Sequence, residues 1–413
     1  MLDKTKEYWF IGIKGTGMAS LALILHDMGY HVAGSDIEKH TFTQDPLLAK
    51  GIKITPFDAN NIKDQGQVII KGNAFKEENV EVKACIDKKI AWQSYPDTVQ
   101  EIIAQHTSIG VSGSHGKTST TGLLAHVLGQ LAPTSFLIGD GTGKAIKDSR
   151  FFVYEADEYR RHFLAYHPDY QIMTNVDFDH PDYFKDRDDY ASAFQTAAEQ
   201  TKKGLFVWGD DTRLNNIQVS IPKYTYGFNN TDDFQAYDIQ KNITGSTSVI
   251  AVAYIEKESL DLVRAALLTY KGAKRRFSEK SYGKINIIDD YAHHPTEMKA
   301  TLQAARQKYP NKILVAIFQP HTYSRTAEFA DQFVEILKTA DYAYVTPIFG
   351  SARENHGNIS SQDLTKRIPN SEVISLDNIA DLTKFKDAVL VFMGAGDITK
   401  YEVAYEALLE QNK

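Results

Sequence analysis

One stretch of this chain, Ile109-Gly-Val-Ser-Gly-Ser-His-Gly-Lys-Thr-Ser-Thr-Thr121, passes from an apolar run through a glycine-rich turn into a helical pattern. Gly113 and Gly116 let backbone N–H groups converge on a phosphate, and the following helix adds the positive end of its dipole. Lys117 supplies a charge for the β- and γ-phosphates, and Thr118 supplies a hydroxyl for Mg²⁺. The stretch therefore predicts a strand, a phosphate loop and a helix that bind a nucleoside triphosphate.

The whole loop is expected to contact ATP. The expected ATP-binding residues are Gly113, Ser114, His115, Gly116, Lys117, Thr118 and Ser119. The general phosphate-loop pattern has glycine six positions before the lysine, where this chain has Val111, with Gly110 one residue further back. The alternative is a strand–turn–helix corner that uses its glycines for geometry alone, and the Lys-Thr pair that follows directly favours the phosphate loop.

Composition indicates an ordinary globular protein. The chain has 413 residues, 42% of them hydrophobic and 11% aromatic, and a net charge of −7. This length predicts roughly two to four domains. A net negative charge without a basic stripe argues against a nucleic-acid partner.

The start of the chain and its cysteine content bear on location. Residues 1–7 are charged where a signal peptide needs an apolar core, and no apolar run approaches ~18 residues. The single cysteine, Cys85, forms no internal disulfide and fits a reducing compartment. We expect a cytoplasmic protein without membrane insertion, in which Cys85 is a packing residue.

The N-terminal region has a Rossmann-type pattern. Residues 8–13 form an apolar strand pattern, residues 18–28 have helical periodicity and residues 31–36 form a second strand pattern. Glycines stand at the turn as Gly12, Gly15 and Gly17, and Asp36 follows about 20 residues later. Shorter strand patterns occur at 52–55, 68–70 and 90–91. This first domain is expected to end near His106.

Strand and helix patterns alternate through the rest of the chain. Further strands are expected at 151–155, 170–175, 284–290, 313–318, 342–347 and 389–397, and helices after Tyr190 and Thr212. Such alternation predicts an α/β fold with parallel sheets and ligand sites at the carboxyl ends of the strands.

Two acidic clusters follow apparent strands. Glu155 ends the first of these strands, and His180 lies in the segment 174–182 after the next. Carboxylate oxygens and a neutral imidazole can complete the shell of a hard dication that also bridges phosphate oxygens. The expected metal ligands are Thr118, Glu155 and His180, and the alternative for each acidic run is a solvated loop or a helix cap.

A third polar cluster, residues 289–297, joins a strand end to a helix start with Pro295 at the first helical position. His293 and His294 could bind an anionic substrate there, and one of the two is expected to be structural. Lys274-Arg-Arg276 and Arg325 offer cations for carboxylate or phosphate, unless they form a solvated interdomain face. Gly394-Ala-Gly396 could meet a nucleotide or only turn the chain.

These residues together resemble the ATP-dependent Mur ligases. The motifs that carry the resemblance are Phe10-Ile-Gly-Ile-Lys-Gly-Thr-Gly-Met18, Gly113-Ser-His-Gly-Lys-Thr-Ser119, Glu155-Ala-Asp-Glu158, Thr174-Asn175 with Asp179-His180, Arg275-Arg-Phe277, Asp289-Asp-Tyr-Ala-His-His-Pro-Thr-Glu297, Gln319-Pro-His321 and Met393-Gly-Ala-Gly-Asp397. They span nearly the whole chain in family order. The resemblance implies a Rossmann-like UDP-sugar-binding domain at 1–106, a central P-loop ATPase-type α/β domain at 107–280 and a C-terminal Rossmann-like α/β domain at 281–413.

The resemblance also implies roles for single residues. The expected substrate-binding residues are Gly15, Gly17, Asp36, Arg276, His293 and Arg325. Gly15 and Gly17 would approach the pyrophosphate of a UDP-sugar, and Asp36 would reach its uridine side. The expected catalytic residues are Lys117, His180 and His293. ATP and Mg²⁺ are the implied cofactors.

With His115 at this position, the phosphate loop resembles that of the muramate-accepting branch of the family. That branch joins L-alanine to the lactyl carboxylate of UDP-N-acetylmuramate through an acyl phosphate, in peptidoglycan precursor synthesis. Both small molecules are expected partners. The alternatives are a ligase that recycles a preformed tripeptide, a non-catalytic nucleotide-sugar-binding paralogue and, on the N-terminal glycines alone, a dehydrogenase.

The chain departs from the family in two places. The Gly-x-His-Asn-x-x-Asn segment that helps to hold the adenine nucleotide is absent, and roughly 25–30 residues, about two strands and a connection, are missing near 248–255. Thr322 stands where many relatives have an additional arginine.

Overall fold

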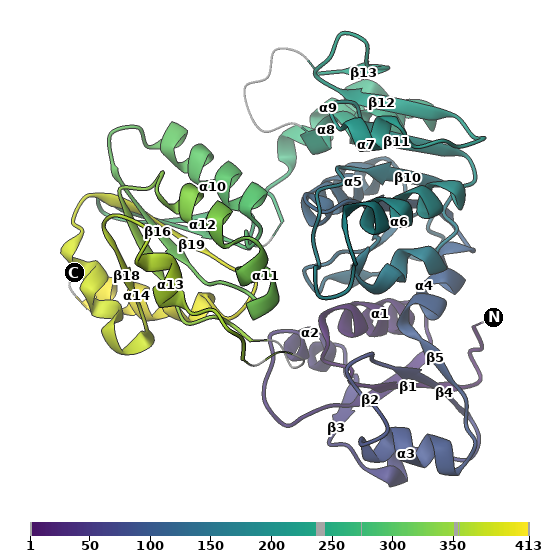
Figure 1. Cartoon of the computed structure of the whole chain (residues 1–413). Coiled ribbons are helices and arrows are strands. Elements are labelled where there is room, and N and C mark those ends of the chain that lie inside the picture. Colours follow the sequence, from purple (N-terminus) through teal and green to yellow (C-terminus); the bar gives the residue numbers. More distant parts are fainter. Residues whose placement is uncertain (1, 237–243, 274, 351–353, 355, 412–413) are drawn as a thin grey trace. The chain divides into compact units, whose positions relative to one another are not determined.

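The structure is a computed structural model that describes residues 2–236, 244–273, 275–350, 354 and 356–411 (Figure 1). Three sheets with helices on their faces confirm the predicted α/β fold. The chain divides into two compact units, one of Met1–Phe178 with Asp186–Ala273 and one of Asp179–Lys185 with Lys274–Lys413. Within the described residues, none of the helices combines the length and the apolar character needed to span a membrane.

The first sheet has five parallel strands in the order β3-β2-β1-β4-β5. Its strands are β1 (Glu7–Ile11), β2 (His31–Ser35), β3 (Lys53–Thr55), β4 (Gln67–Lys71) and β5 (Trp92–Ser94). Its helices are α1 (Thr16–Asp27), α2 (Gln44–Ala49), α3 (Val80–Asp87), α4 (Tyr95–Ile103) and the short η1 (Ala59–Asn61). The strand expected at 90–91 was placed too early, because the Ile90 N–H still closes the end of α3 by donating to the Cys85 carbonyl.

The second sheet has eight strands in the order β13-β12-β11-β10-β6-β9-β7-β8. Its strands are β6 (Thr107–Ser112), β7 (Thr134–Leu137), β8 (Gly143–Lys144), β9 (Phe151–Glu155), β10 (Tyr170–Met173), β11 (Gly204–Trp208), β12 (Lys223–Gly227) and β13 (Phe234–Gln235). Only β7 and β8 pair in antiparallel fashion. The central strand β6 lies between β9 and β10, so the three carboxyl ends meet at one edge of the sheet.

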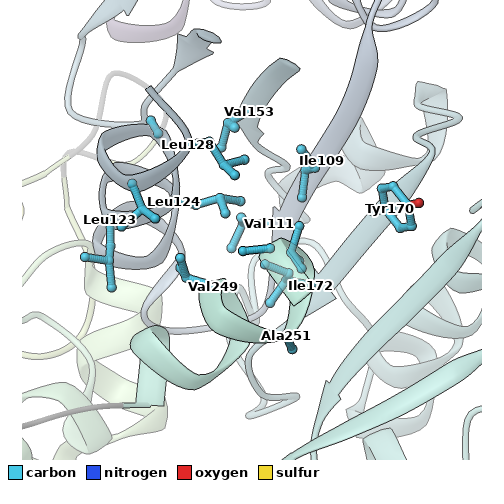
Figure 2. Close-up of a cluster of buried hydrophobic side chains, with 14 of the residues drawn as sticks. Ile109, Val111, Leu123, Leu124, Leu128, Val153, Tyr170, Ile172, Val249 and Ala251 are labelled. Carbon is cyan, nitrogen blue, oxygen red and sulfur yellow. The ribbon is translucent and has the colours of Figure 1, made fainter. Parts of the chain in front are cut away.

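Helices cover this sheet as α5 (Lys117–Leu131), η2 (Tyr159–Ala165), α6 (Arg187–Glu199), α7 (Thr212–Asn215), α8 (Thr244–Ile255) and α9 (Leu260–Thr269). Leu124 of α5 and Val249 of α8 pack on Val111 of β6 in a fully buried apolar cluster (Figure 2). Residues 248–255, near which relatives are expected to have further strands, thus lie in α8 and contribute to the core.

The third sheet has the order β14-β15-β19-β16-β17-β18, and only β14 is antiparallel to its neighbour. Its strands are β14 (Ser278–Tyr282), β15 (Ile285–Asp290), β16 (Ile313–Phe318), β17 (Tyr342–Val345), β18 (Ser371–Val373) and β19 (Ala388–Met393). Its helices are α10 (Pro295–Lys308), α11 (Tyr323–Glu328), α12 (Ala330–Leu337), α13 (Ser361–Thr365), η3 (Leu376–Lys384) and α14 (Thr399–Gln411). Asp290 and Phe318 both pair with Met393, so the polar segments that follow these strands leave from one edge.

A buried carboxylate holds the first domain together. Glu81 of α3 is fully buried and accepts hydrogen bonds from Trp9 Nε1 at 3.2 Å, Asn61 Nδ2 at 2.7 Å and the Asp58 backbone N–H at 3.2 Å. The Ser35 hydroxyl donates to the same carboxylate. Because a buried charge is tolerated only when its acceptor positions are filled, these four donors fix α3 against the sheet.

We expect Glu81→Ala to lower the free energy of unfolding of the first domain by about 3 kcal/mol, since it leaves several buried donors without an acceptor. Urea unfolding followed by circular dichroism and tryptophan fluorescence measures this change. Glu78→Ala, at an exposed position just before α3, is the control and should stay within about 0.5 kcal/mol of the parent. Equal stability of the two variants would contradict the assignment.

Candidate active site

The phosphate loop lies between β6 and α5, as the sequence predicts. Gly113 has φ +137°, and a Cβ at this position would lie 2.0 Å from Thr174 Oγ1, so only glycine fits. Gly116 is the N-cap of α5 in the left-handed conformation, with φ 81°. The chain therefore turns sharply at both glycines, and α5 begins at Lys117 with its positive dipole end at the loop.

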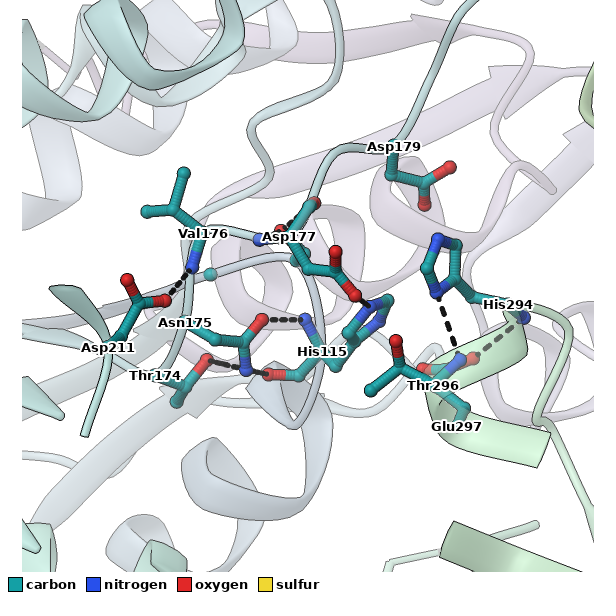
Figure 3. Close-up of polar contacts among 12 residues, drawn as sticks. His115, Thr174, Asn175, Val176, Asp177, Asp179, Asp211, His294, Thr296 and Glu297 are labelled. Atoms are coloured by element: carbon teal, nitrogen blue, oxygen red, sulfur yellow. Dashed lines mark hydrogen bonds and ion pairs between the residues drawn. The ribbon is translucent and has the colours of Figure 1, made fainter. Parts of the chain in front are cut away.

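Two residues that follow β10 hold the backbone of the loop (Figure 3). Asn175 Oδ1 accepts a hydrogen bond from the His115 N–H at 3.0 Å, and Asn175 Nδ2 donates to the His115 carbonyl at 3.0 Å. Thr174 Oγ1 donates to the same carbonyl at 2.6 Å. The His115 N–H is therefore already used within the protein, whereas an α-helix leaves the amides of its first turn, here at the start of α5, without internal acceptors.

Lys117 lies folded back under the loop. Its ammonium donates to the carbonyls of Gly113 and Ser114 and forms an ion pair with Glu158 Oε2 at 2.8 Å. Burial lowers the pKa of Lys117, but the charges of Glu158, Glu155 and Asp157 outweigh it, so the pKa lies above its usual value. Lys117 is therefore fully protonated at neutral pH.

Glu158 and Tyr190 belong to this site, although the sequence analysis assigned neither of them a role. The Tyr190 hydroxyl lies 3.4 Å from Glu158 Oε1 and 2.8 Å from Ser114 Oγ. Ser114 Oγ in turn donates to the Asp177 carbonyl, so its side chain serves the fold. Glu158 could have been suspected from its place three residues after Glu155, whereas nothing in the local sequence marks Tyr190.

Glu155 ends β9 directly beside the phosphate loop. It pairs in register with Val111 of β6, two residues before Gly113. Its Oε2 accepts a hydrogen bond from the Gly139 N–H at 2.9 Å, in the hairpin between β7 and β8. Thr118 is buried in the first turn of α5. Thr118 and Glu155 are thus both held at the carboxyl edge of the second sheet.

The same hairpin lies against α1. A Cβ on Gly143 would stand 2.3 Å from the Ser20 carbonyl oxygen, so the two backbones are in direct contact. The Ala145 N–H also lies 3.3 Å from Asp27 Oδ2. The hairpin therefore contacts α1 on one side and Glu155 on the other.

The glycine-rich turn after β1 has the geometry expected of a Rossmann unit. Gly15 is the N-cap of α1, and Gly17 lies against the ring of Tyr95. Asp36 is buried, and its two oxygens accept hydrogen bonds from the Lys14 N–H at 2.7 Å and the Ile37 N–H at 2.8 Å. Asp36 thus fixes the turn, and its predicted contact with uridine stays a prediction.

In the second unit Arg325 forms a buried ion pair with Asp179. Arg325 Nε and Nη2 donate to Asp179 Oδ1 at 3.0 and 2.8 Å, and the side chains are only 7% and 5% exposed. Burial raises the pKa of Asp179, but the charge of Arg325 outweighs this and holds it well below its usual value. Arg325 is therefore a buried, oriented guanidinium that already binds one carboxylate.

His180 belongs to the same unit and has a left-handed backbone with φ 57°. Its Nδ1 lies 3.5 Å from Arg325 Nη2, and its Nε2 lies 3.8 Å from Asp179 Oδ2. Thr118 and Glu155, the other two predicted metal ligands, belong to the first unit. The metal site therefore stays a prediction.

His293 and His294 have different environments. His294 is the N-cap of α10, where its Nδ1 accepts from the Thr296 N–H at 3.3 Å and Glu297 completes a capping box (Figure 3). It is the structural member of the pair, as expected for one of them. Burial and the nearby charge of Arg325 lower the pKa of His293 to about 3, so His293 is a neutral imidazole. Its Nδ1 lies 3.3 Å from Glu297 Oε2.

Arg275 and Arg276, which precede β14, have different partners. Arg275 donates to Asp289 and to the Gly394 carbonyl, and so ties the start of this unit to its sheet. Arg276 lies over the Tyr291 ring at 5.2 Å and forms a long ion pair, 3.8 Å, with Glu297. Its contact with a substrate stays a prediction, and Lys274 lies outside the described residues.

The Gly394-Ala-Gly396 turn packs on Gln319 at the end of β16. A Cβ on Gly394 would lie 2.9 Å from Gln319 Cβ, and one on Gly396 would lie 2.4 Å from Gln319 Oε1. Gln319 Nε2 donates to Asp397 Oδ1 at 2.8 Å. This packing supports the interpretation that the glycines turn the chain.

Comparison with known proteins gives a consistent result over the whole chain. Family models match consecutive parts of it: the Mur ligase family catalytic domain at residues 7–107, the Mur ligase middle domain at 111–270 and the Mur ligase glutamate ligase domain at 275–398. The chain is 67% identical to the UDP-N-acetylmuramate–L-alanine ligase of Lactobacillus acidophilus over 437 residues, which cover 99% of this chain and 100% of that relative. It is 55% identical to the ligase of the same name from Pediococcus pentosaceus, with the same coverage.

Solved structures show the same fold. The UDP-N-acetylmuramate–alanine ligase of Thermotoga maritima matches with a TM-score of 0.81 at 24% identity, covering 98% of this chain and 100% of that chain. A murein peptide ligase of Psychrobacter arcticus matches with a TM-score of 0.71 at 23% identity and 98% coverage of both chains. With its three family domains in order and close relatives along its full length, this chain belongs to the Mur ligase family.

Proposed function

We propose that this chain is an ATP-dependent ligase that joins L-alanine to the lactyl carboxylate of UDP-N-acetylmuramate, in peptidoglycan precursor synthesis. The observation that carries the proposal is the 67% identity, over the full length of both chains, to ligases of that activity. The phosphate loop supports the proposal, because hydrogen bonds to Asn175 fix its His115 backbone and its buried Lys117 offers a positive charge.

The chemistry explains why ATP is needed. A carboxylate resists attack by an amine because it is negatively charged and has no leaving group. Transfer of the γ-phosphoryl group to the lactyl carboxylate gives an acyl phosphate. The neutral amine of L-alanine then adds to the acyl carbon, the C–O bond to phosphate breaks, the amine loses a proton, and the products are an amide, ADP and phosphate.

Lys117 is the proposed charge for the transferred phosphoryl group. It is fully protonated, lies at the start of α5 and is held within the loop by carbonyl oxygens. A positioned cation that meets charge developing in the transition state contributes a few kcal/mol to catalysis. The amides of Gly116, Thr118 and Ser119 would bind the phosphates through the helix start, while Gly113 and Ser114 shape the loop.

Mg²⁺ is the proposed metal, with Thr118, Glu155 and His180 as its ligands. A hydroxyl at the first turn of the phosphate-loop helix and a carboxylate at the end of the neighbouring strand form an oxygen donor set suited to a hard dication. The Gly139 N–H that binds one oxygen of Glu155 would orient the other. When bound, the ion would neutralise charge on the phosphate oxygens.

The substrate contacts complete the proposal. Gly15 and Gly17 would approach the diphosphate of the UDP-sugar, with Asp36 on the uridine side and at the same time holding the turn. Arg276, His293 and Arg325 would orient the carboxylates of the substrates. Because His293 is neutral, it can accept or donate a hydrogen bond without adding charge. The domain ranges 1–106, 107–280 and 281–413 belong to this proposal, and the three family-model matches support them.

The shortened central domain gives this proposal a specific point to test. The alignment to the Lactobacillus acidophilus relative spans 437 residues, whereas this chain has 413, so that relative carries residues that this chain lacks. A non-catalytic UDP-sugar-binding protein would bind the sugar nucleotide without binding ATP. Calorimetry with each nucleotide separates that function from the ligase.

We expect Lys117→Ala to reduce ATP-dependent ligation by at least about a hundredfold, because the transferred phosphoryl group loses a positioned charge. Phosphate release from ATP in the presence of UDP-N-acetylmuramate and L-alanine measures the loss. Binding of UDP-N-acetylmuramate, measured by calorimetry, should change less than about twofold, since the proposed UDP-sugar site belongs to another domain.

Lys147→Ala is the matched control, because Lys147 is an exposed lysine of the same domain. It should ligate at the rate of the parent chain. A Lys117→Ala protein that ligates like Lys147→Ala would show that the phosphate loop has been assigned wrongly.

The amine specificity is a separate prediction. With ATP and UDP-N-acetylmuramate held saturating, we expect kcat/KM for L-alanine to exceed that for a preformed L-alanyl-D-glutamyl-diaminopimelate tripeptide by at least about tenfold. Amide formation with each amine supplied alone measures the ratio. A preference for the tripeptide would instead assign the chain to the recycling ligases.

A further inference from the structure

The lysine of the phosphate loop has a buried acidic partner. Lys117 Nζ lies 2.8 Å from Glu158 Oε2, and the two side chains are 12% and 1% exposed. Glu158 lies three residues beyond the end of β9 and is the N-cap residue of η2. The pair is formed entirely within the first unit.

All three hydrogens of this ammonium have acceptors. They go to the Gly113 carbonyl, to the Ser114 carbonyl at 3.1 Å and to Glu158. A lysine ammonium has three donors and no more. Lys117 can therefore reach a phosphate oxygen only after it releases one of these acceptors.

The three acceptors differ in what their release would cost. The carboxylate of Glu158 is almost fully buried, and the Tyr190 hydroxyl lies 3.4 Å from its Oε1. A buried carboxylate that loses its cation is strongly destabilised, whereas a loop carbonyl that loses one hydrogen bond is affected far less. The loop carbonyls are therefore the acceptors that Lys117 can exchange for phosphate.

Glu158 is itself held in place. The hydroxyl of Tyr190 in α6 lies 2.8 Å from Ser114 Oγ. Ser114 Oγ also donates a hydrogen bond to the Asp177 carbonyl and accepts one from the Asp177 N–H at 2.9 Å. The carboxylate thus rests on a hydroxyl that is tied to the phosphate loop and to the segment after β10. It has no exposed direction in which to swing.

We propose that Glu158 is a positioning residue for the ligation reaction. It keeps the Lys117 ammonium in place while the hydrogens given to the loop carbonyls turn to the phosphates of ATP. The inference rests on the proposed function, and it separates the two glutamates of the Glu155-Ala-Asp-Glu158 motif. Glu155 accepts a hydrogen bond from the β7–β8 hairpin and is a proposed metal ligand, whereas Glu158 forms the ion pair with Lys117.

The test is the isosteric variant Glu158→Gln, which removes the charge and keeps the shape. We expect kcat for ligation to fall at least about tenfold, because Lys117 is no longer held by a carboxylate. The dissociation constant for ATP should change less than about threefold, since the loop amides still bind the phosphates. Glu158→Asp keeps the charge and should recover at least part of the lost kcat.

Glu199→Gln is the matched control. It makes the same chemical change at an exposed glutamate of the same unit, and should leave kcat within about twofold of the parent. Calorimetric stoichiometry of ATP binding counts the folded sites in each variant, so that kcat is expressed per competent site.

Two results would overturn the inference. One is a Glu158→Gln protein with the kcat of Glu199→Gln; the other is a Glu158→Asp protein that is no better than Glu158→Gln. If Glu158→Gln binds ATP at too few sites to be assayed, Tyr190→Phe takes its place. We expect Tyr190→Phe to lower kcat about two- to fivefold, and an unchanged kcat overturns the inference. In all of these cases the parent chain still ligates, whereas failure of the parent chain to bind ATP would overturn the proposed function itself.

Discussion

The proposed ATP site depends on the hydrogen bonds by which Asn175 and Thr174 fix the backbone of His115. β6 and β10 are neighbours in a parallel sheet, so the segments that follow them leave at the same edge. Asn175 occupies both backbone groups of His115, and Thr174 adds a second donor to the carbonyl. These bonds fix the shape of the loop from within the protein, which would spare a bound nucleotide the entropic cost of ordering it. Gly113 has to remain glycine because Thr174 lies so close.

The acidic residues of the motifs divide into those that hold the protein and those that are placed for ligands. Asp36 binds two backbone amides, Asp289 binds Arg275, and Glu158 binds Lys117. Glu155 keeps one oxygen on a backbone amide and lies half buried at the sheet edge. A carboxylate is suited to both tasks, and only the partners that the fold brings to it decide which one it performs.

Much of the fold could be predicted from periodicity, because the strands are short apolar runs that end in glycine or charged residues. The phosphate loop, the Rossmann turn and the helix start at Pro295 follow from local rules about φ angles and missing N–H groups. β5 begins at Trp92 and not at Ile90, because Ile90 and Ala91 are apolar residues of the link between α3 and β5, and the Ile90 N–H bonds back to the Cys85 carbonyl. Periodicity cannot separate the last turn of a helix from the first residue of a strand.

The site was predicted less completely, since its pairs join residues far apart in sequence. Lys117 was evident, yet its partner Glu158 stands 41 positions later and Tyr190 still further. Likewise, Arg325 was expected to bind an anion, but its pairing with Asp179 spans 146 positions. Local sequence patterns contain no information on such distances. The prediction that one of His293 and His294 is structural was correct, because a polar residue just before Pro295 is placed to cap the helix.

The β7–β8 hairpin has a mechanical consequence. Gly143 touches the Ser20 carbonyl of α1. Gly139, four residues earlier in the same hairpin, donates its N–H to the carboxylate of Glu155. Because the backbone of Gly143 packs directly on the backbone of Ser20, no flexible side chain lies between them that could accommodate a shift of α1 towards the hairpin. The helix that begins at the glycine-rich turn after β1 and the carboxylate beside the phosphate loop are thus joined through one short hairpin, so a displacement of α1 would press on the segment that binds Glu155.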